Sequence, residues 1–287
     1  MQISGRTRIV GIIGDPVAHS LSPAMHNAAF RALGLDFAYV AFPVRPAQVR
    51  HAIEGIRSLG IAGVNVTVPH KERVIQWLDS ISPTAQRAGA VNTIVNRNGQ
   101  LRGENTDVTG FVRALEDEEF AIRGCRALVV GAGGVARAVL AALVKGKAAA
   151  ITVANRTVPR ARRLARAVPS GKAGTKAAPL AVLREREILE SVDLVVNATS
   201  IGLHGERFVP LAYDATGPSC LFVDLIYGRR TDFLARAVAA RRRTVDGSGM
   251  LVHQGAAAFT LWTGRPAPVR LMRRALLAAT PSATHPS

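Results

Sequence analysis

The chain has 287 residues, of which 48% are hydrophobic, and its 37 basic and 20 acidic side chains give a formal net charge of +17. This length and composition exclude a disordered chain and leave room for two domains, each with its own core. The two cysteines, Cys125 and Cys220, are too far apart in sequence to indicate a disulfide framework or a metal knuckle, so we expect a reduced, cytoplasmic setting.

The positive charge could attract nucleic acid, an anionic membrane or an anionic small molecule. Aromatic residues make up only 5% of the chain, which leaves few platforms for stacking on single strands, and the usual nucleic-acid-binding patterns are missing. The apolar run near the N-terminus is broken by Gly11 and followed by Asp15, so it is too short for a signal peptide or a membrane span. We therefore expect neither nucleic acid nor membrane as a partner and assign most of the excess charge to a solvated surface.

The first third of the chain predicts strands alternating with helices. The expected strands are 8–13, 37–42, 63–68, 91–96 and 99–103, and the expected helices are 24–33, 46–59, 72–78 and about 107–118. The order strand, helix, strand, helix, strand is typical of a small, mostly parallel sheet with helices on both faces.

Two hydroxyl residues, Ser20 and Ser22, come just before the first predicted helix, which Pro23 opens. The free amides of a helix N-terminus favour an anion, so these serines are a candidate carboxylate site. The alternative is that Ser22 only caps the helix. His19 and His26 lie nearby, but no cysteine or acidic side chain stands at a metal-ligand spacing, so we expect no bound metal.

Lys71 is the candidate for acid–base chemistry. Alternating valines from Gly63 onward predict a half-buried strand, and Pro69 stops that strand just before the lysine. A lysine there is held by rigid backbone, with Asn65 and Thr67 alongside. The simpler interpretation, a solvated lysine that begins a helix, is weakened by a second polar segment that ends in Asp107. That aspartate, taken alone, would be an ordinary helix N-cap.

The second part of the chain predicts a dinucleotide-binding turn. A strand at 125–130 leads into a G-x-G-x-x-A pattern and then into a helix rich in alanine, leucine and valine that runs to about residue 143. In this order the glycines let the backbone approach the pyrophosphate of a bound dinucleotide, and the free amides at the helix N-terminus can bind it. The predicted cofactor-binding residues of this turn are Gly131, Ala132, Gly133, Gly134, Val135 and Ala136.

The next strand, 150–154, ends in Asn155, Arg156 and Thr157, with Arg160 three residues further on. An NAD-binding domain usually carries an acidic residue here, which binds the ribose 2′-hydroxyl. Guanidinium groups instead attract a 2′-phosphate, so the sequence predicts NADP rather than NAD. The alternative is that both arginines are solvated members of a basic helix.

Further strands are predicted at 193–197, 221–225 and 244–246, a helix at about 231–240, and a long helix from residue 247 that returns to the first domain. Residues 169–179 are rich in glycine, alanine and lysine and are expected to form a loop, and the tail after Ala279 is expected to fray. A small-residue loop containing Thr199, Ser200 and Gly202 follows a strand, where open α/β sheets bind cofactors.

Several motifs in one order make the chain resemble the shikimate dehydrogenase family over nearly its whole length. They are residues 14–27, 63–71, 88–93, 103–107 and the Asn-Arg-Thr-x-x-Arg pattern from Asn155. The resemblance implies a two-domain α/β fold, with residues 1–106 and 251–287 as a mostly parallel substrate-binding and catalytic domain and residues 107–250 as a Rossmann-type NADP-binding domain. It implies reversible NADPH-dependent reduction of 3-dehydroshikimate to shikimate, in chorismate and aromatic amino acid biosynthesis, by a monomer or homodimer.

The resemblance also assigns roles to single residues. It implies Lys71 as the acid–base group with Asp107 as its partner, and it adds Leu225 and Gly249 to the cofactor-binding residues. The implied substrate-binding residues are Ser20, Ser22, Asn65, Thr67, Lys71, Asn92, Asp107, Tyr227 and Gln254.

Two positions depart from the family pattern, because Arg229 replaces a proline and Leu203 a common methionine. The alternatives to a shikimate dehydrogenase are a quinate/shikimate dehydrogenase paralogue and a non-catalytic NADP-binding regulator.

Overall fold

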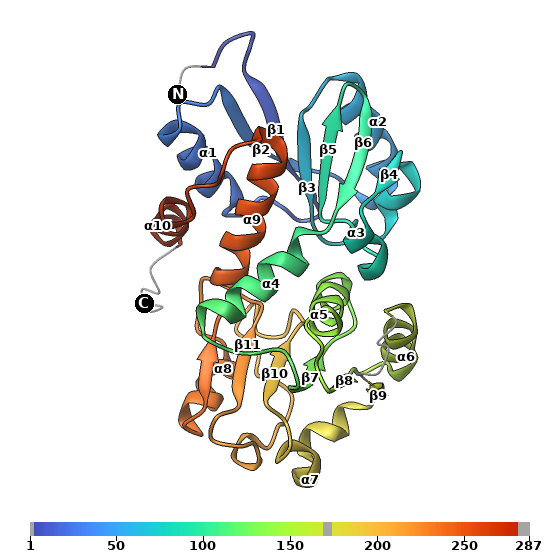
Figure 1. The fold of residues 1–287 in the computed structure, drawn as a ribbon, viewed down its shortest axis with the longest axis vertical. Helices are drawn as coiled ribbons and strands as arrows, with labels where there is room; N and C mark the ends of the chain where they lie inside the picture. Colours follow the sequence, from blue (N-terminus) through green and yellow to red (C-terminus); the bar gives the residue numbers. More distant parts are fainter. Residues whose placement is uncertain (1–2, 169–173, 281–287) are drawn as a thin grey trace. The chain divides into compact units, whose positions relative to one another are not determined.

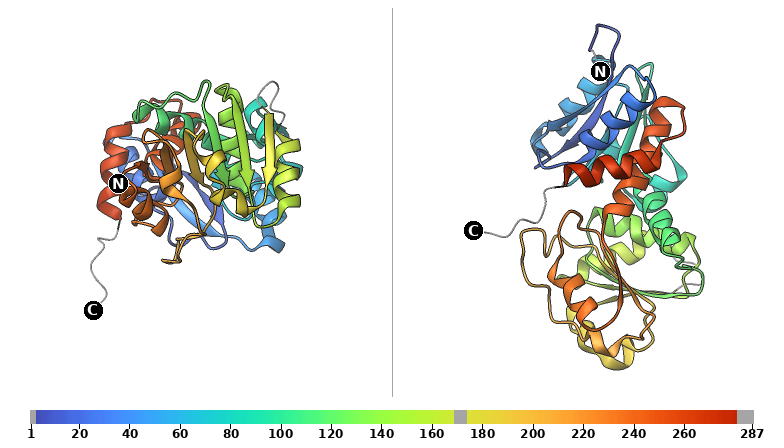
Figure 2. Two further views of the ribbon diagram at one scale, coloured as in Figure 1. Left: turned by 90° about the horizontal axis from the view of Figure 1, so that it is seen from below. Right: turned by 90° about the vertical axis from the view of Figure 1, so that its left-hand side faces the viewer.

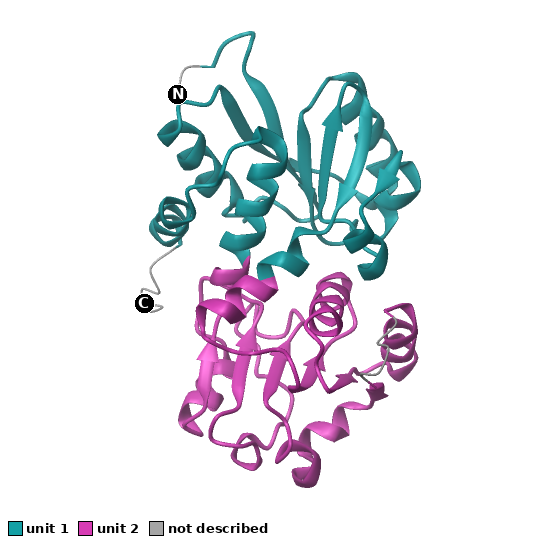
Figure 3. Cartoon of the chain, viewed as in Figure 1, with its two compact units in different colours: residues 1–110, 251–287 teal, residues 111–250 magenta. Residues whose placement is uncertain are grey.

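The protein is described here by a computed structural model that covers residues 3–168 and 174–280. It divides into two compact units, Met1–Gly110 with Leu251–Ser287, and Phe111–Met250 (Figure 3). Part of the predicted loop, residues 169–173, and the tail from residue 281 lie outside the described residues. Within the described part of the chain, no helix has the length and apolar character needed to cross a membrane.

The first unit contains a mixed sheet with strand order β2-β1-β3-β5-β6-β4 (Figure 1). β1 is parallel to β2 and β3, and β4 is parallel to β6, whereas β5 is antiparallel to both β3 and β6. The elements are β1 (Arg8–Gly14), α1 (Ser22–Ala32), β2 (Phe37–Pro43), η1 (Pro46–Gln48), α2 (Val49–Ser58), β3 (Gly63–Val66), η2 (Arg73–Trp77), β4 (Ser80–Ile81), α3 (Pro83–Ala88), β5 (Thr93–Arg97), β6 (Gln100–Glu104), the start of α4 (Thr106–Asp117), most of α9 (Ser248–Thr263) and α10 (Val269–Ala279).

Strand direction brings distant parts of the sequence to one edge of this sheet. The carboxyl ends of the parallel strands β1 and β3 lie together, with Ile13 opposite Val66. Because β5 is antiparallel to β3, its first residue, Thr93, lies opposite Asn65, and the last residue of β6, Glu104, lies opposite Thr93. The segments after β1, β3 and β6 and the segment before β5 therefore start from the same edge.

Each face of the first sheet has its own hydrophobic core. On one face, residues of α1, α9 and α10, including Phe30, Phe259 and Met272, pack with Val10 of β1. On the other face, Ile53 of α2 packs with valines of β3. Trp262 of α9 donates from Nε1 to the carbonyl oxygen of Ile94 (3.0 Å). A Cβ at Gly63 would collide with that indole, so only glycine lets α9 lie this close to the sheet.

The second unit contains a parallel sheet with strand order β12-β11-β10-β7-β8-β9. Its residues are coloured from green through yellow to orange in Figure 2. If β7 is counted as the first strand and the order is read from β9 to β12, this is the 3-2-1-4-5-6 order of a doubly wound dinucleotide-binding fold. The switch point of that fold lies between β7 and β10. Its elements are β7 (Arg126–Val130), α5 (Gly134–Lys145), β8 (Ala150–Ala154), α6 (Val158–Ala167), β9 (Gly174–Ala178), η3 (Leu180–Arg184), α7 (Arg186–Leu189), β10 (Leu194–Asn197), η4 (Tyr213–Ala215), β11 (Leu221–Asp224), α8 (Asp232–Ala239) and β12 (Arg243–Val245).

The predicted α/β fold class and most of the predicted elements are confirmed, and three predictions are wrong. The strand before Lys71 ends at Val66, and Val68 is 62% exposed, so the alternation in the sequence outlasts the buried strand. Residues Arg73–Trp77 form a 3-10 helix in place of the expected α-helix. Residues Gly174–Ala178, expected in a loop, form β9, because pairing along β8 overrides the low strand propensity of this glycine- and alanine-rich segment.

Candidate functional site

Lys71 and Asp107 form an ion pair at the convergent edge of the first sheet. The Nζ atom of Lys71 lies 2.7 Å from Oδ2 of Asp107, and the two side chains are only 12% and 8% exposed. The backbone carbonyl of Lys71 accepts from the amide of Val91 (2.8 Å), which ties the lysine segment to the segment before β5. The interpretation of Lys71 as a solvated lysine is therefore wrong.

Asn92 holds the other side of the same carboxylate. Its Nδ2 donates to Oδ1 of Asp107 (2.8 Å), and its Oδ1 accepts from the backbone amide of Thr106 (2.6 Å). Because a backbone amide can only donate, the orientation of the Asn92 side chain is fixed. Asn92 Nδ2 also lies 3.5 Å from Oε1 of Gln254 in α9. Both oxygens of Asp107 thus face a donor.

Asp107 does not cap α4. That position belongs to Asn105, whose Oδ1 accepts from the amide of Val108 (3.3 Å) and whose Nδ2 donates to the carbonyl of Ala90 (2.8 Å). The aspartate lies inside the first turn of the helix, where a negative charge is favoured by the helix dipole. Its side chain is therefore free of the capping role and available to Lys71 and Asn92.

Ser22 also has no capping role, because it is the first residue of α1 and the N-cap residue is Leu21. The amide of Ser22 donates to Oγ of Ser20 (3.3 Å), so the two serines are in contact. Ser22 is 3% exposed and Ser20 is half-buried. Both follow the carboxyl end of β1, at the edge from which the Lys71 segment starts.

Asn65 and Thr67 come from β3 and the residue just beyond it. Asn65 is buried, and its side chain bonds to Tyr39, Asn92 and Thr93. The methyl group of Thr67 packs against Gly14, where a Cβ would collide with it. Thr67 is therefore held beside the end of β1.

Three polar residues of this cluster are not among the residues predicted from the sequence, namely Tyr39, Thr93 and Thr106. The Oγ1 atoms of the two threonines lie 3.0 Å apart, and Thr93 also donates to Oδ1 of Asn92 (3.1 Å). Thr93 follows Asn92 and Thr106 precedes Asp107 in the chain, so both threonines could have been predicted from their neighbours. Tyr39 has no such signal, because its contact with Asn65 crosses from β2 to β3.

Two further predicted substrate residues come from elements outside the sheet edge, Gln254 from α9, where it reaches Asn92, and Tyr227 from the second unit. Gln254 is buried in α9, where its Nε2 donates to the carbonyl of Leu251 (3.0 Å). Tyr227 belongs to the second unit, follows β11, and is partly buried, and this burial raises the pKa of its phenol. Arg229, the departure from the family proline, is exposed, and Gly228 before it has a positive φ of 78°.

The glycine turn after β7 fits a dinucleotide. Gly131 has a φ of 116°, and a Cβ there would collide with the carbonyl oxygen of Ala198 after β10, so glycine is required at the switch point. Gly133 precedes α5 without a side-chain cap, and a Cβ there would meet only open space. Backbone at the start of α5 is thus open to a pyrophosphate, as such a turn requires. The turn comprises Gly131, Ala132, Gly133, Gly134, Val135 and Ala136.

The segment after β8 presents basic side chains at the next strand end. Arg156, Thr157 and Arg160 are exposed, and Asn155 donates from Nδ2 to the carbonyl of Thr157 (3.0 Å), which fixes the turn into α6. Since β7 and β8 are parallel neighbours, these guanidinium groups emerge from the same edge as the glycine turn. That position fits a ribose 2′-phosphate.

A buried polar network holds the loop after β10. Asp224 accepts from Asn197 Nδ2 (3.0 Å) and from the hydroxyl of Thr231 (2.6 Å), and burial raises the pKa of this carboxyl. Asn197 in turn accepts from the amide and the hydroxyl of Thr199. This network fixes the loop beside the glycine turn.

Four other predicted cofactor residues follow β10, follow β11 or lie at the start of α9. Ser200 is exposed, Gly202 has a φ of 104°, and Leu225 follows β11. Gly249 is buried in the first turn of α9, where a Cβ would be 3.5 Å from that of Ala114. A small residue therefore suits this position.

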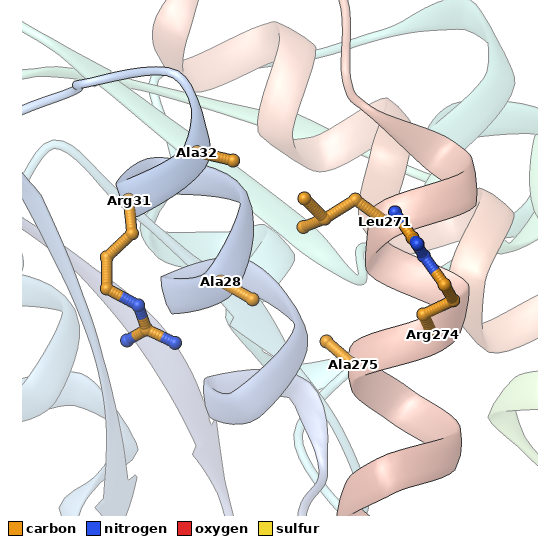
Figure 4. Close-up of a pocket in the computed structure, with 6 residues that line it drawn as sticks. All are labelled: Ala28, Arg31, Ala32, Leu271, Arg274 and Ala275. Atoms are coloured by element: carbon orange, nitrogen blue, oxygen red, sulfur yellow. The ribbon is translucent and has the colours of Figure 1, made fainter.

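A separate groove of about 610 Å³ lies between α1 and α10 of the first unit, and none of the predicted site residues lines it (Figure 4). Ala28 and Ala32 face Leu271 and Ala275 across it, and it is also lined by Arg31 and Arg274. In residues 3–168 and 174–280, no group of three or more histidine, cysteine or acidic side chains could hold a metal ion.

A doubly wound sheet with a glycine turn, together with a first unit that carries a buried lysine–aspartate pair, defines a two-unit α/β protein of the nicotinamide-dependent dehydrogenase class. Comparison with known families agrees. The shikimate dehydrogenase substrate binding domain matches residues 12–94, the shikimate/quinate 5-dehydrogenase family residues 114–232, and the shikimate 5′-dehydrogenase C-terminal domain residues 247–277. The chain belongs to the shikimate dehydrogenase family.

Individual relatives match over almost their whole length. The shikimate dehydrogenase (NADP(+)) of Geobacter metallireducens is 46% identical over 283 residues, which cover 97% of this chain and 99% of the relative. The crystal structure of the Thermus thermophilus enzyme in complex with NADP(H) and shikimate is 39% identical, with a TM-score of 0.84 over 95% of this chain and 99% of that one. The Listeria monocytogenes enzyme in complex with shikimate and NAD is 33% identical, with a TM-score of 0.88 over 96% and 98%.

Proposed function

We propose that the chain catalyses the reversible NADPH-dependent reduction of 3-dehydroshikimate to shikimate, with Lys71 and Asp107 as its acid–base pair. The observation that carries this assignment is the buried contact of 2.7 Å between the two side chains, at the strand edge from which Ser20, Ser22, Asn65, Thr67 and Asn92 also emerge. The activity is that of NADP-dependent shikimate dehydrogenases, which match nearly the whole chain. It serves the synthesis of chorismate and aromatic amino acids.

Reduction of a ketone requires a proton donor beside the carbonyl oxygen, because hydride addition leaves an alkoxide. NADPH, when bound, supplies the hydride. Lys71 gives the proton from Nζ in reduction and takes it back in oxidation. Asp107 keeps the ammonium group of Lys71 oriented and accepts a hydrogen bond from a neighbouring substrate hydroxyl. Asn92 holds the carboxylate in place.

The same proposal assigns substrate contacts. Ser20 and Ser22, at the N-terminus of α1, bind the substrate carboxylate, since helix amides favour an anion there. The remaining residues bind the ring hydroxyl groups by hydrogen bonds. They are Asn65, Thr67, Asn92, Asp107, Gln254 and, from the second unit, Tyr227.

Residues 107–250, which include the whole second unit, are proposed as the NADP-binding domain, and the rest of the chain as the substrate-binding and catalytic domain. The doubly wound strand order and the open backbone at Gly133 support this division. Arg156 and Arg160 bind the 2′-phosphate. The other proposed cofactor contacts come from the glycine turn, Asn155, Thr157, Thr199, Ser200, Gly202, Leu225 and Gly249.

A steady-state assay with shikimate and either NADP⁺ or NAD⁺ tests the proposal. We expect turnover with shikimate and a clear preference for NADP⁺. Turnover of quinate with NAD⁺ in place of this activity would favour the alternative of a quinate/shikimate dehydrogenase, which the shared family description supports. NADP⁺ binding without turnover of either substrate would favour a non-catalytic regulator.

We further propose a cytoplasmic location and a monomeric or homodimeric state. Both cysteines, Cys125 and Cys220, are free and buried, which suits a reducing compartment. Sedimentation of the purified protein would distinguish one copy from two.

A further inference from the structure

We infer that Tyr39 is a positioning residue for substrate binding, because its hydroxyl fixes the Asn65 amide so that Asn65 offers a ligand only an accepting oxygen. This inference rests on the proposed function, which places Asn65 in contact with substrate.

The contact joins two strands that are not neighbours in the sheet. Tyr39 lies in β2 beside Val10 of β1, and Val10 lies beside Gly63 of β3, so the tyrosine side chain reaches over β1. Its hydroxyl donates to Oδ1 of Asn65 at 2.8 Å, and Asn65 is 4% exposed. The tyrosine therefore determines what this buried amide oxygen can still bind.

The opposite end of the Asn65 amide is also fixed. Its Nδ2 faces the carbonyl oxygen of Asn92 (3.3 Å) and Oγ1 of Thr93 (3.0 Å). A carbonyl cannot donate, so the nitrogen must point this way, and both of its hydrogens are used. One lone pair of Oδ1 remains for a ligand. Asn65 thus selects a hydroxyl group that donates and disfavours a methyl ether or a carbonyl at the same place.

Tyr39 itself is held on both sides. Its ring stacks on that of His26, with centroids 4.5 Å apart and an interplanar angle of 5°. The side chain of Asn27 accepts from the amide of Tyr39 (2.8 Å) and donates to its carbonyl (3.0 Å). The hydroxyl is therefore presented from a fixed ring, and Tyr39→Phe removes it without removing the stacking.

Steady-state kinetics of Tyr39→Phe test the inference. We expect the KM for shikimate to rise about fivefold, the effect of one net hydrogen bond, while kcat and the KM for NADP⁺ stay unchanged within error. Tyr213→Phe is the matched control, since the Tyr213 hydroxyl is buried and lacks a hydrogen-bond partner among the described residues. An unchanged KM in Tyr39→Phe, or an equal rise in both variants, would overturn the inference.

A double-mutant cycle separates positioning from a general packing effect. If Tyr39 acts through Asn65, then Tyr39→Phe adds nothing to the KM of Asn65→Ala. Two independent, additive increases would contradict this route. An Asn65→Ala enzyme with the KM of the unmodified protein would also overturn the inference.

A second measurement does not depend on catalysis. The side-chain amide signals of Asn65 in a ¹⁵N–¹H spectrum can be assigned by their loss in Asn65→Ala. We expect these signals to shift in Tyr39→Phe and to stay in place in Tyr213→Phe. Unchanged signals in Tyr39→Phe would refute the contact itself. An unmodified protein without shikimate turnover would refute the proposed function instead, and the spectra would still decide whether Tyr39 orients Asn65.

Discussion

The Nζ atom of Lys71 and the Oδ2 atom of Asp107 lie 2.7 Å apart, although 36 positions separate the two residues in the chain. The lysine follows β3 and the aspartate follows β6, and strand direction alone brings these two segments to one edge of the sheet. Asn92 donates to the second oxygen of the carboxylate, so the aspartate cannot rotate without losing a bond. Removing either charge leaves the other buried without its ionic partner.

Lys71→Met should lower kcat by about two orders of magnitude or more, because the alkoxide loses its proton donor. The KM for shikimate should change little. Lys145→Met serves as the control, since Lys145 lies at the far end of α5 from the glycine turn. Steady-state rates in both directions measure the effect, and a Lys71→Met enzyme with most of its turnover would reject the acid–base assignment.

Ser22→Ala should raise the KM for shikimate more than it lowers kcat. The hydroxyl is proposed to bind the substrate carboxylate, which is remote from the reacting carbon, and Ser22 caps no helix whose stability would be lost. Removing one charge-assisted hydrogen bond corresponds to about a tenfold rise or more. The comparison requires shikimate titrations at saturating NADP⁺. A larger fall in kcat than rise in KM would count against carboxylate binding.

Arg156→Ala should weaken the binding of NADP⁺ and leave the binding of NAD⁺ almost unchanged, because the guanidinium is proposed to bind only the 2′-phosphate. Loss of one charged hydrogen-bonding partner predicts about a tenfold rise in the Kd of NADP⁺. Arg166→Ala, at the opposite end of α6, is the matched control. Calorimetric titration of both cofactors measures the change. An equal rise in the Kd values of NADP⁺ and NAD⁺ would show that Arg156 does not bind the 2′-phosphate.

His26→Phe should make folding stability less sensitive to acid. Burial lowers the pKa of His26 from 6.5 to about 3, and neither ring nitrogen has a hydrogen-bond partner among the described residues. Between these values the unfolded chain binds the extra proton, so stability falls as pH falls below 6.5. At pH 5 this loss is about 2 kcal/mol.

Urea unfolding at pH 7.5 and pH 5 measures the difference for the unmodified protein and His26→Phe. The variant should lose less stability on acidification, whatever its stability at neutral pH. His51→Gln is the control, because His51 is exposed. Equal acid losses in the unmodified protein and His26→Phe would contradict the assignment.

Local patterns in the sequence were sufficient for most of the strands and helices and for the glycine turn. Segments whose conformation depends on a pairing partner were harder to predict. β9 illustrates this, since Gly174–Ala178 becomes a strand only along the free edge of β8. The end of β3 at Val66 is a second case, because the valine alternation continues to the exposed Val68.

Site residues next to a motif were predictable, and contacts across the sheet were not. Asn92 and Asp107 were predicted because each belongs to a short polar segment of the sequence. Thr93 and Thr106 could have been predicted too, since each is next to one of these residues. The sequence cannot show that Asn105, and not Asp107, caps α4, because both residue types cap helices equally well. It also cannot place the Tyr39 hydroxyl on Asn65, which depends on the register of three strands.

The close packing of Trp262 over Gly63 has a consequence for how the protein is made. Trp262 lies in α9, near the end of the chain, yet it covers the sheet built by the first hundred or so residues. A nascent chain leaving the ribosome therefore exposes the part of that apolar side that α9 and α10 cover until these two helices emerge. Fragments that stop before α9 should aggregate, whereas residues 111–250 contain the whole of their own sheet and can fold before the chain is complete.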